Sequence, residues 1–474
     1  MRITFSRLTS CAVVLFIVSL SACAIASEVT LRSHLLVCGD ILSASGVVDV
    51  RTSIGPWLPI PVIQSCDNAV PLISILIISC LVASTAWLAL LRRPPSEATT
   101  IVLFTIAAGL AIAFPYFSTT DAYAYALYGY EAGILHISPY YQHVFPAHSN
   151  SPITATLRAL FPTQNSVRVA NYGVVFIMIY GALAFATNGS LVASLICMRI
   201  LSAASLFLLA MIISRLVPLE YRRRTLVFVL LQPLVLFEAI AFAHADVLML
   251  VMCTLGVAAY ALNAVSLSAA LFALGSAIRS IAALAAFTLV MYMLKSLQYH
   301  KLSRFIAASA VSFGVLITGS ILVYHTFTLG SGPGINPYSS PSMLIATATH
   351  HLTNDAKPYA IAQALAALVC LANAVLRGKY PWASVWILAA LPTLHPWYTC
   401  WLLPVAALTN DLRFRAVAVT IMVVAIFGEY SLISRHVSIE AARLYVCAQW
   451  ILPAIVYMLG SFSKDGPLRQ PAVA

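Results

Sequence analysis

An acid at the edge of an apolar run is the residue in this sequence best placed to do chemistry. Asp121 closely follows a hydrophobic segment and opens a tyrosine-rich stretch, DAYAYALYGYEAG, in which Tyr125 comes four residues later. A carboxylate at a lipid boundary, partly removed from water, can act as a general base toward a hydroxyl group. The alternative is a turn or helix-end acid whose oxygens accept hydrogen bonds from nearby backbone N–H groups.

A histidine and a second acid interrupt the apolar sequence LFEAIAFAHADVLML as His244 and Asp246. Such a pair could bind a substrate hydroxyl, a phosphate or a metal ion. A metal site usually needs three or four ligands, so one histidine and one aspartate form a weak metal pattern. A polar hydrogen bond between helices is the alternative interpretation of this pair.

Arg279 lies in the middle of the apolar run 266–294. Ionisable residues within membrane segments are costly and typically mark a functional site. Guanidinium geometry suits phosphate oxygens, so Arg279 is a candidate contact for the phosphate of a lipid carrier. The alternative is an ion pair with an acid such as Glu238.

A polar and aromatic motif, His395-Pro396-Trp397-Tyr398, breaks another apolar run. Proline frees backbone groups that must be satisfied inside the protein. Aromatic faces beside a polar histidine suit a sugar ring, but tryptophan and tyrosine are equally typical of membrane interfaces. His395, Trp397 and Tyr398 are therefore candidate sugar-binding residues or interfacial anchors.

The composition requires membrane helices to position these residues. Apolar residues make up 61% of the 474-residue chain and charged residues only 9%, and the mean hydropathy is +0.93. Soluble proteins typically carry about 25% charged residues. Repeated apolar runs of roughly 17–25 residues, separated by short charged or Pro/Gly segments, predict an all-α, polytopic transmembrane protein rather than an outer-membrane barrel.

The basic residues predict how the chain threads the bilayer. The net charge of +11 is scattered in ones to threes, which indicates membrane orientation rather than nucleic-acid binding. A cytoplasmic position for Arg222-Arg223-Arg224 requires 172–187 to be interfacial or re-entrant rather than a span. One membrane domain (1–474) of about 12–14 spans results, with a polar outer-face loop after the third span. The expected helical segments are 9–27, 69–91, 99–116, 193–214, 226–242, 247–263, 305–327, 358–376, 416–432 and 444–462, with short up-and-down pairs in 266–294 and 381–409. The expected outer loops are 28–68, 117–192 and 328–357.

The N-terminal segment has the basic start and short apolar core of a signal peptide. We interpret it as an uncleaved first helix, because many spans follow it. The first outer loop holds Cys38 and Cys66, which form either a disulfide, if the loop faces an oxidising periplasm, or two separate thiols.

This threading gathers the acids and histidines on the outer face of the membrane. Asp121, His244 and Asp246 fall there, and His395 approaches that face from a short helix pair. An outward-facing active site follows. No P-loop, GxGxxG, CxxC or GxSxG motif is present in the chain, which weakens the case for ATP-driven transport and redox chemistry.

The ordered motifs between residues 114 and 405 resemble those of the polyprenol-phosphate-mannose-dependent mannosyltransferases of the GT-C superfamily of integral membrane glycosyltransferases. The matching elements are Asp121, Tyr125 and Gly129, Ser138-Pro139-Tyr140, Tyr172-Gly173-Val174, His244-Ala245-Asp246 and His395-Pro396-Trp397-Tyr398. Ser138, Val174 and Ala245 stand where the family has Asn, Pro and Asn.

The resemblance implies a GT-C fold and an inverting sugar transfer, with mannose as the expected sugar. Asp121 would deprotonate an acceptor hydroxyl, which attacks the anomeric carbon and displaces polyprenyl phosphate. Arg279 and His244 would hold the phosphate, and Tyr125, Tyr140 and Asp246 would help to bind substrate. The implied partners are a polyprenyl-phosphate sugar, a glycan or glycolipid acceptor and membrane lipid. The site would face the periplasm or exterior from a bacterial cytoplasmic membrane. No cofactor is required, and a divalent metal stays an open alternative.

A transporter or flippase for lipid-linked saccharides is the alternative function. It predicts charges at the membrane midplane and an internal repeat, whereas this sequence shows no convincing repeat and places its polar residues toward one face.

Overall fold

A computed structural model gives the fold and describes residues 9–23, 25, 69–113, 121–141, 170–326, 356–391, 395–409, 411–433 and 439–462. Cys38 and Cys66 lie outside the described residues. The chain divides into two compact units, Met1–Ala286 with His300–Gly332 and Phe287–Tyr299 with Pro333–Ala474. Each unit is described by itself.

The described part of the chain is entirely helical, with no strand assigned in it, which confirms the predicted all-α class. Two described helices are long and apolar enough to cross a membrane, and a bent pair, Leu219–Leu230 with Pro233–Ala241, makes up to three. Nine shorter apolar helices of 10–17 residues accompany them in the described ranges. These features fit a polytopic helical membrane protein, and the number of about 12–14 spans stays a prediction.

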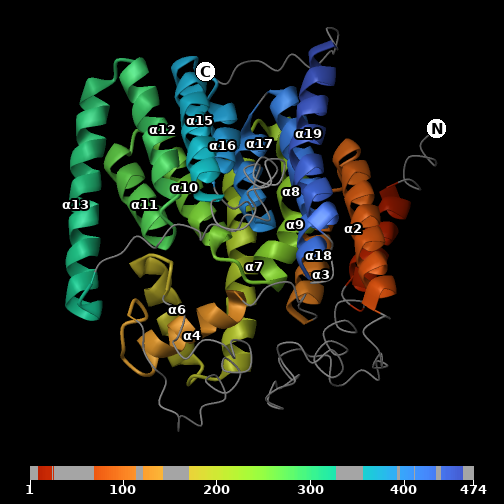
Figure 1. The fold of residues 1–474 in the computed structure, drawn as a ribbon, viewed down its shortest axis with the longest axis horizontal. Coiled ribbons are helices and arrows are strands. Elements are labelled where there is room, and N and C mark those ends of the chain that lie inside the picture. The colour runs from red at the N-terminus through yellow and green to blue at the C-terminus, as the bar shows by residue number, and fades with distance from the viewer. Residues whose placement is uncertain are drawn as a thin grey trace. The chain divides into compact units, whose positions relative to one another are not determined.

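The frame of the first unit consists of apolar helices that follow the expected segments closely (Figure 1). They are α2 (Ala69–Arg92), α3 (Glu97–Ala113), α7 (Leu191–Leu216), α10 (Asp246–Ala261) and α13 (Tyr299–Tyr324). The indole N–H of Trp87 on α2 donates to the carbonyl of Val227 at 3.0 Å, which fixes α2 against the segment after the arginine run.

The segment expected as a helical span over 226–242 is helical but broken near its middle. It consists of a short turn, η4 (Leu219–Tyr221), then α8 (Arg222–Leu230), α9 (Pro233–Val235) and a π-helix, η5 (Leu236–Ala241), with a bend of 49° before Pro233. Proline has no N–H to donate and clashes with the preceding turn, so the helix restarts there. The side chain of Gln232 caps the restart by accepting from the N–H of Val235 at 2.6 Å.

Four short helices form in the segments that the sequence predicted as interruptions. The run around Arg279 forms two half-length helices, α11 (Val265–Ile278) and α12 (Ala282–Lys295), as expected. The segment predicted to be interfacial or re-entrant forms α6 (Val174–Ala186), whose 13 residues reach only about 20 Å, too short for a hydrocarbon core of about 30 Å. The polar loop after the third span contains a further helix, α4 (Asp121–Gly133).

Helices α4 and α6 pack against each other at unusually short range (Figure 1). A Cβ on Gly129 would collide with the carbonyl of Tyr180, and one on Gly133 with the carbonyl of Gly181. Small residues spaced four apart allow two helix backbones to approach in this way. The contact fixes the register of α4, which carries Asp121, on α6.

The second unit is also helical. It contains α15 (Ala356–Leu376), α16 (Tyr380–Ala389), a 3₁₀-helix η7 (Pro396–Trp401), α17 (Leu402–Leu408), α18 (Leu412–Ile433) and α19 (Ile439–Phe462). The up-and-down pair expected in 381–409 corresponds to α16 and α17, with η7 at the proline between them. The indole of Trp382 donates to Asp411 at 2.9 Å, which ties α16 to the start of α18.

Candidate active site

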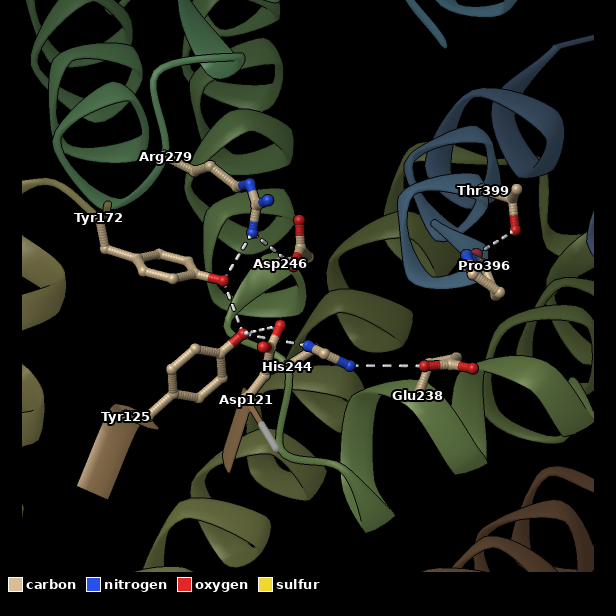
Figure 2. Close-up of polar contacts among 9 residues, drawn as sticks. All are labelled: Asp121, Tyr125, Tyr172, Glu238, His244, Asp246, Arg279, Pro396 and Thr399. Carbon is tan, nitrogen blue, oxygen red and sulfur yellow. Dashed lines mark hydrogen bonds and ion pairs between the residues drawn. The ribbon is translucent and has the colours of Figure 1, made fainter. Parts of the chain in front are cut away.

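The first residue of α4 is Asp121, whose side chain is partly exposed. One turn later, the buried Tyr125 points its hydroxyl toward this carboxylate, with 3.5 Å between Tyr125 OH and Asp121 Oδ2 (Figure 2). Residues four apart lie on the same face of a helix. The helix therefore holds an acid and a phenol side by side.

An aromatic stack on α6 holds Tyr125 in place. Tyr172, Phe176 and Tyr180 stack in sequence, with ring centroids 4.2 and 4.1 Å apart. The ring of Tyr125 meets all three edge-on at 5.1–5.8 Å. Such edge-to-face pairs contribute roughly 0.5–1.5 kcal/mol each beyond simple burial. The hydroxyl of Tyr125 is therefore precisely oriented rather than free to swing.

A glycine brings Tyr172 to the break between α11 and α12. The N–H of Gly173 donates to the carbonyl of Ile278 at 3.2 Å, and a Cβ on Gly173 would collide with the carbonyl of Ala277. Arg279, the residue after α11, then donates from NH1 to the hydroxyl of Tyr172 at 2.9 Å. Its guanidinium carbon lies 5.0 Å from the centroid of the same ring, a cation–π contact.

The turn between η5 and α10 presents His244 from a strained backbone. Ala243 has a positive φ of 55°, which is unusual for a residue with a side chain and often accompanies function. Two side chains hold the turn by its carbonyls: Arg199 donates to Ala241 at 3.0 Å and Tyr180 donates to Ala243 at 3.3 Å. The π-helix before the turn is also a form frequent at functional sites.

His244 links Tyr125 to a second acid. Its Nδ1 lies 3.1 Å from Tyr125 OH, and its Nε2 lies 3.5 Å from Glu238 Oε2 (Figure 2). The side chains of His244 and Glu238 are only 1% and 2% exposed. The imidazole is thus buried, with a hydrogen bond at Nδ1 and with Nε2 at ion-pair distance from a carboxylate.

Asp246 completes the site at the first turn of α10. Its Oδ2 lies 3.3 Å from NH1 of Arg279 in an ion pair, with Asp246 2% and Arg279 13% exposed. The hydroxyls of Tyr125 and Tyr172 are 2.6 Å apart. One connected network therefore runs from Asp121 through two phenols to the Arg279–Asp246 pair, with a branch to His244 and Glu238 (Figure 2).

The electrostatics of this network keep its central phenol neutral. Burial raises the pKa of Tyr125 well above its ordinary value, and the neighbouring Tyr172 and Asp121 raise it further. Tyr125 therefore acts as a neutral hydroxyl that can donate one hydrogen bond and accept two.

The structure brings together five of the residues that the sequence singled out. Asp121, Tyr125, His244, Asp246 and Arg279 come from three separate segments and meet in one network. The alternative of an Arg279–Glu238 pair is replaced by Arg279–Asp246, since Glu238 lies against His244.

The remaining predicted site residues have other described contacts. Tyr140 packs edge-on against Tyr324 with ring centroids 6.0 Å apart. His395, Trp397 and Tyr398 belong to the second unit, where the imidazole stacks on Trp397 at 4.2 Å and meets Tyr398 edge-on. A flat, stacked aromatic pair of this kind is compatible with sugar binding or with an interfacial anchor, and their role stays a prediction.

Two residues of the network were not among the predicted site residues. Tyr172 appeared only within a motif, and Glu238 only as a possible partner for Arg279. The glycine after Tyr172 is the signal that could have identified it, since a glycine beside an aromatic residue often marks close backbone approach. Glu238 could have been found as a rare acid inside an apolar run.

A metal site receives no support from the described ranges. They contain no group of three or more His, Cys, Asp or Glu side chains arranged to hold a metal ion.

Comparison with known protein families identifies the chain. Residues 30–295 match the family described as "Alpha-(1->6)-mannopyranosyltransferase, N-terminal domain". No curated protein and no solved structure shows a significant match. The match covers 266 of 474 residues, more than half of the chain, and contains the whole Asp121–Arg279 network. The protein therefore belongs to this mannosyltransferase family and is a glycosyltransferase.

Proposed function

We propose that this protein transfers mannose from a polyprenyl-phosphate donor to a hydroxyl of a glycan or glycolipid, with inversion, on the outer face of a bacterial cytoplasmic membrane. The proposal rests on the short distance between a candidate base, Asp121, and a cation, Arg279. Asp121 and Arg279 are separated only by the hydroxyls of Tyr125 and Tyr172, which contact each other at 2.6 Å. An acceptor and a phosphate could therefore be held on two sides of one sugar.

In this mechanism Asp121 accepts the proton of the acceptor hydroxyl as its oxygen forms a bond to the anomeric carbon. The bond between that carbon and the phosphate oxygen breaks, and its electron pair leaves with polyprenyl phosphate. Arg279 stabilises the negative charge that grows on this phosphate, because a guanidinium offers a rigid set of donors to anionic oxygens. Attack and departure on opposite sides give inversion.

Asp246 and His244 have supporting tasks in the same mechanism. Asp246 orients Arg279 through the ion pair at 3.3 Å. His244 lies 3.1 Å from Tyr125, and we therefore assign it to the acceptor side of the network instead of the phosphate contact that the family resemblance implied. Tyr140, His395, Trp397 and Tyr398 remain candidate contacts for the sugar and the lipid carrier.

The donor class is tested with purified protein in nanodiscs. Polyprenyl-phosphate mannose labelled in the sugar is supplied with mixed mannosyl acceptors, and GDP-mannose is supplied in a parallel reaction. We expect transfer from the lipid donor alone, release of polyprenyl phosphate, and a product of opposite anomeric configuration by NMR. Transfer from GDP-mannose, or retention of configuration, would contradict the proposal. Movement of the lipid across vesicles without any transfer would favour a flippase.

The outward orientation is tested by cysteine labelling in intact cells. Leu135, 41% exposed just after α4, and Leu219, 71% exposed just before the arginine run, give accessible positions on the two predicted sides. We expect an impermeant maleimide to label Leu135→Cys from outside and Leu219→Cys only after lysis. The reverse pattern would place the site in the cytoplasm.

A further inference from the structure

The hydroxyl of Tyr125 has more partners than it has protons. It lies 3.5 Å from Asp121 Oδ2, 2.6 Å from Tyr172 OH and 3.1 Å from His244 Nδ1. A phenol has one proton to donate and two lone pairs that accept. Its single proton can therefore go to only one of these three partners at a time.

The relay uses one of the two possible directions of the hydrogen bond between the phenols, the one in which Tyr172 donates. The oxygen of Tyr172 accepts from Nη1 of Arg279 at 2.9 Å, and in this arrangement the Tyr172 proton points to the oxygen of Tyr125, 2.6 Å away. This leaves one lone pair on Tyr125 for a proton arriving from Asp121, and one proton to pass to His244. The arrangement matches what a two-step proton transfer requires.

Glu238 prepares His244 to receive that proton. When Nε2–H points to the Glu238 carboxylate at 3.5 Å, the lone pair of Nδ1 faces Tyr125. An ionised carboxylate behind one nitrogen of a histidine stabilises the imidazolium that forms when the other nitrogen takes a proton, as in catalytic triads. The long distances are common in sites without substrate and shorten when substrate binds.

We propose that Tyr125, His244 and Glu238 form a relay that removes the acceptor's proton from Asp121 after sugar transfer. The proton on Asp121 Oδ2 moves to the oxygen of Tyr125 while the phenolic proton of Tyr125 moves to His244 Nδ1. Asp121 regains its negative charge, Tyr125 stays neutral, and His244 becomes an imidazolium paired with Glu238. When the products leave, the proton returns through Tyr125 to the partly exposed Asp121 and from there to water. The inference rests on the proposed role of Asp121 as base.

The burial of His244 and Glu238 explains what the relay would achieve. Asp121 is partly exposed, and in this scheme the products cover it until they leave. His244 and Glu238 are almost fully buried, so they can hold the proton inside the protein during that interval. Because the buried Tyr125 strongly resists ionisation, it passes a proton by accepting and donating together rather than by becoming a phenolate. Glu238 acts through His244 and is a positioning residue.

The relay is tested with Tyr125→Phe, Glu238→Gln and the double variant, assayed for mannose transfer in nanodiscs. Each single change should lower kcat on the order of 10²-fold, with KM for donor and acceptor changed less than about twofold, because neither side chain binds substrate in this scheme. The double variant should be no slower than the slower single variant, since both changes break one chain. Tyr128→Phe, which removes another buried hydroxyl from α4, is the matched control and should keep wild-type kcat.

Several outcomes would overturn the relay. Unchanged kcat in either single variant, losses confined to KM, or losses that multiply in the double variant would each refute it. The two single variants are independent, so one that fails to fold leaves the other to decide. If Asp121→Asn abolishes transfer while Tyr125→Phe and Glu238→Gln are fully active, the role of Asp121 as base is supported and the relay is wrong. If the wild-type protein transfers no mannose from a polyprenyl-phosphate donor, the proposed function itself fails.

Discussion

Replacing Glu131 by Gln should stabilise the protein, and more so as the pH rises. Glu131 lies on α4, ten residues after Asp121, and is 0% exposed. Neither of its carboxylate oxygens has a hydrogen-bond partner in the described structure. Burying an ionised carboxylate without a partner is costly, so the group is held in its neutral form instead.

The size and sign of the effect follow from the pKa of Glu131, which burial raises from 4.5 to about 8. Between these values the unfolded chain has lost a proton that the folded chain keeps, so the free energy of unfolding falls as pH rises. The slope is about 1.4 kcal/mol per pH unit for one proton. The contribution is fully present below pH 4.5, is lost progressively up to about pH 8, and totals roughly 5 kcal/mol at most.

Glutamine has nearly the same shape as glutamate and carries no charge at any pH in this range. The assay is thermal unfolding of both proteins in the same detergent at several pH values from 5 to about 8. The variant should gain little over wild type at the acid end and increasingly more toward pH 8. Glu220→Gln, at an exposed glutamate, is the control and should leave the pH dependence unchanged. A Glu131→Gln gain that is independent of pH, or a loss that grows with pH, would refute the reasoning.

Three further predictions concern the site. Arg279→Lys keeps the charge but loses the planar set of donors, so KM for the lipid donor should rise about tenfold; an unchanged KM in steady-state kinetics would argue against phosphate contact. Gly173→Ala forces a Cβ against the carbonyl of Ala277, so activity should fall at least about tenfold and the melting temperature should drop, whereas wild-type values would show that the close approach is unnecessary. Tyr180→Phe removes the hydrogen bond to Ala243 and should cost about 1 kcal/mol in stability together with a several-fold loss of kcat; stability lost without any loss of kcat would limit Tyr180 to a structural role.

Much of the helix arrangement could be predicted from the positions of charged residues in the apolar sequence. Arg279 in an apolar run predicted a break, and α11 and α12 end and begin on either side of it. A cytoplasmic position for Arg222–Arg224 predicted that the segment 172–187 does not span the membrane. The helix in this segment, α6, has only 13 residues. Both inferences used the cost of burying charge in lipid, which depends on composition rather than on tertiary contacts.

The geometry of the site lay beyond such arguments. Tyr125 and His244 are 119 residues apart in sequence, yet they meet at 3.1 Å, and hydropathy carries no information about which buried polar groups will face each other. The π-helix before His244 depends on the restart at Pro233 and on contacts from α7, so the pattern of apolar residues could not reveal it. The choice of Asp246 over Glu238 as partner for Arg279 was likewise decided by packing.

The central claim is that Asp121 removes the acceptor's proton, and Asp121→Asn tests it most directly. The measurement pairs the single-turnover rate of mannose transfer with the equilibrium binding of labelled polyprenyl-phosphate mannose, both in nanodiscs. Asparagine preserves the shape and can accept the hydrogen bond from Tyr125, but it cannot accept a proton. We predict a rate lower by about 10²- to 10⁴-fold with donor affinity unchanged. A variant that binds donor normally and transfers mannose at the wild-type rate would contradict the account.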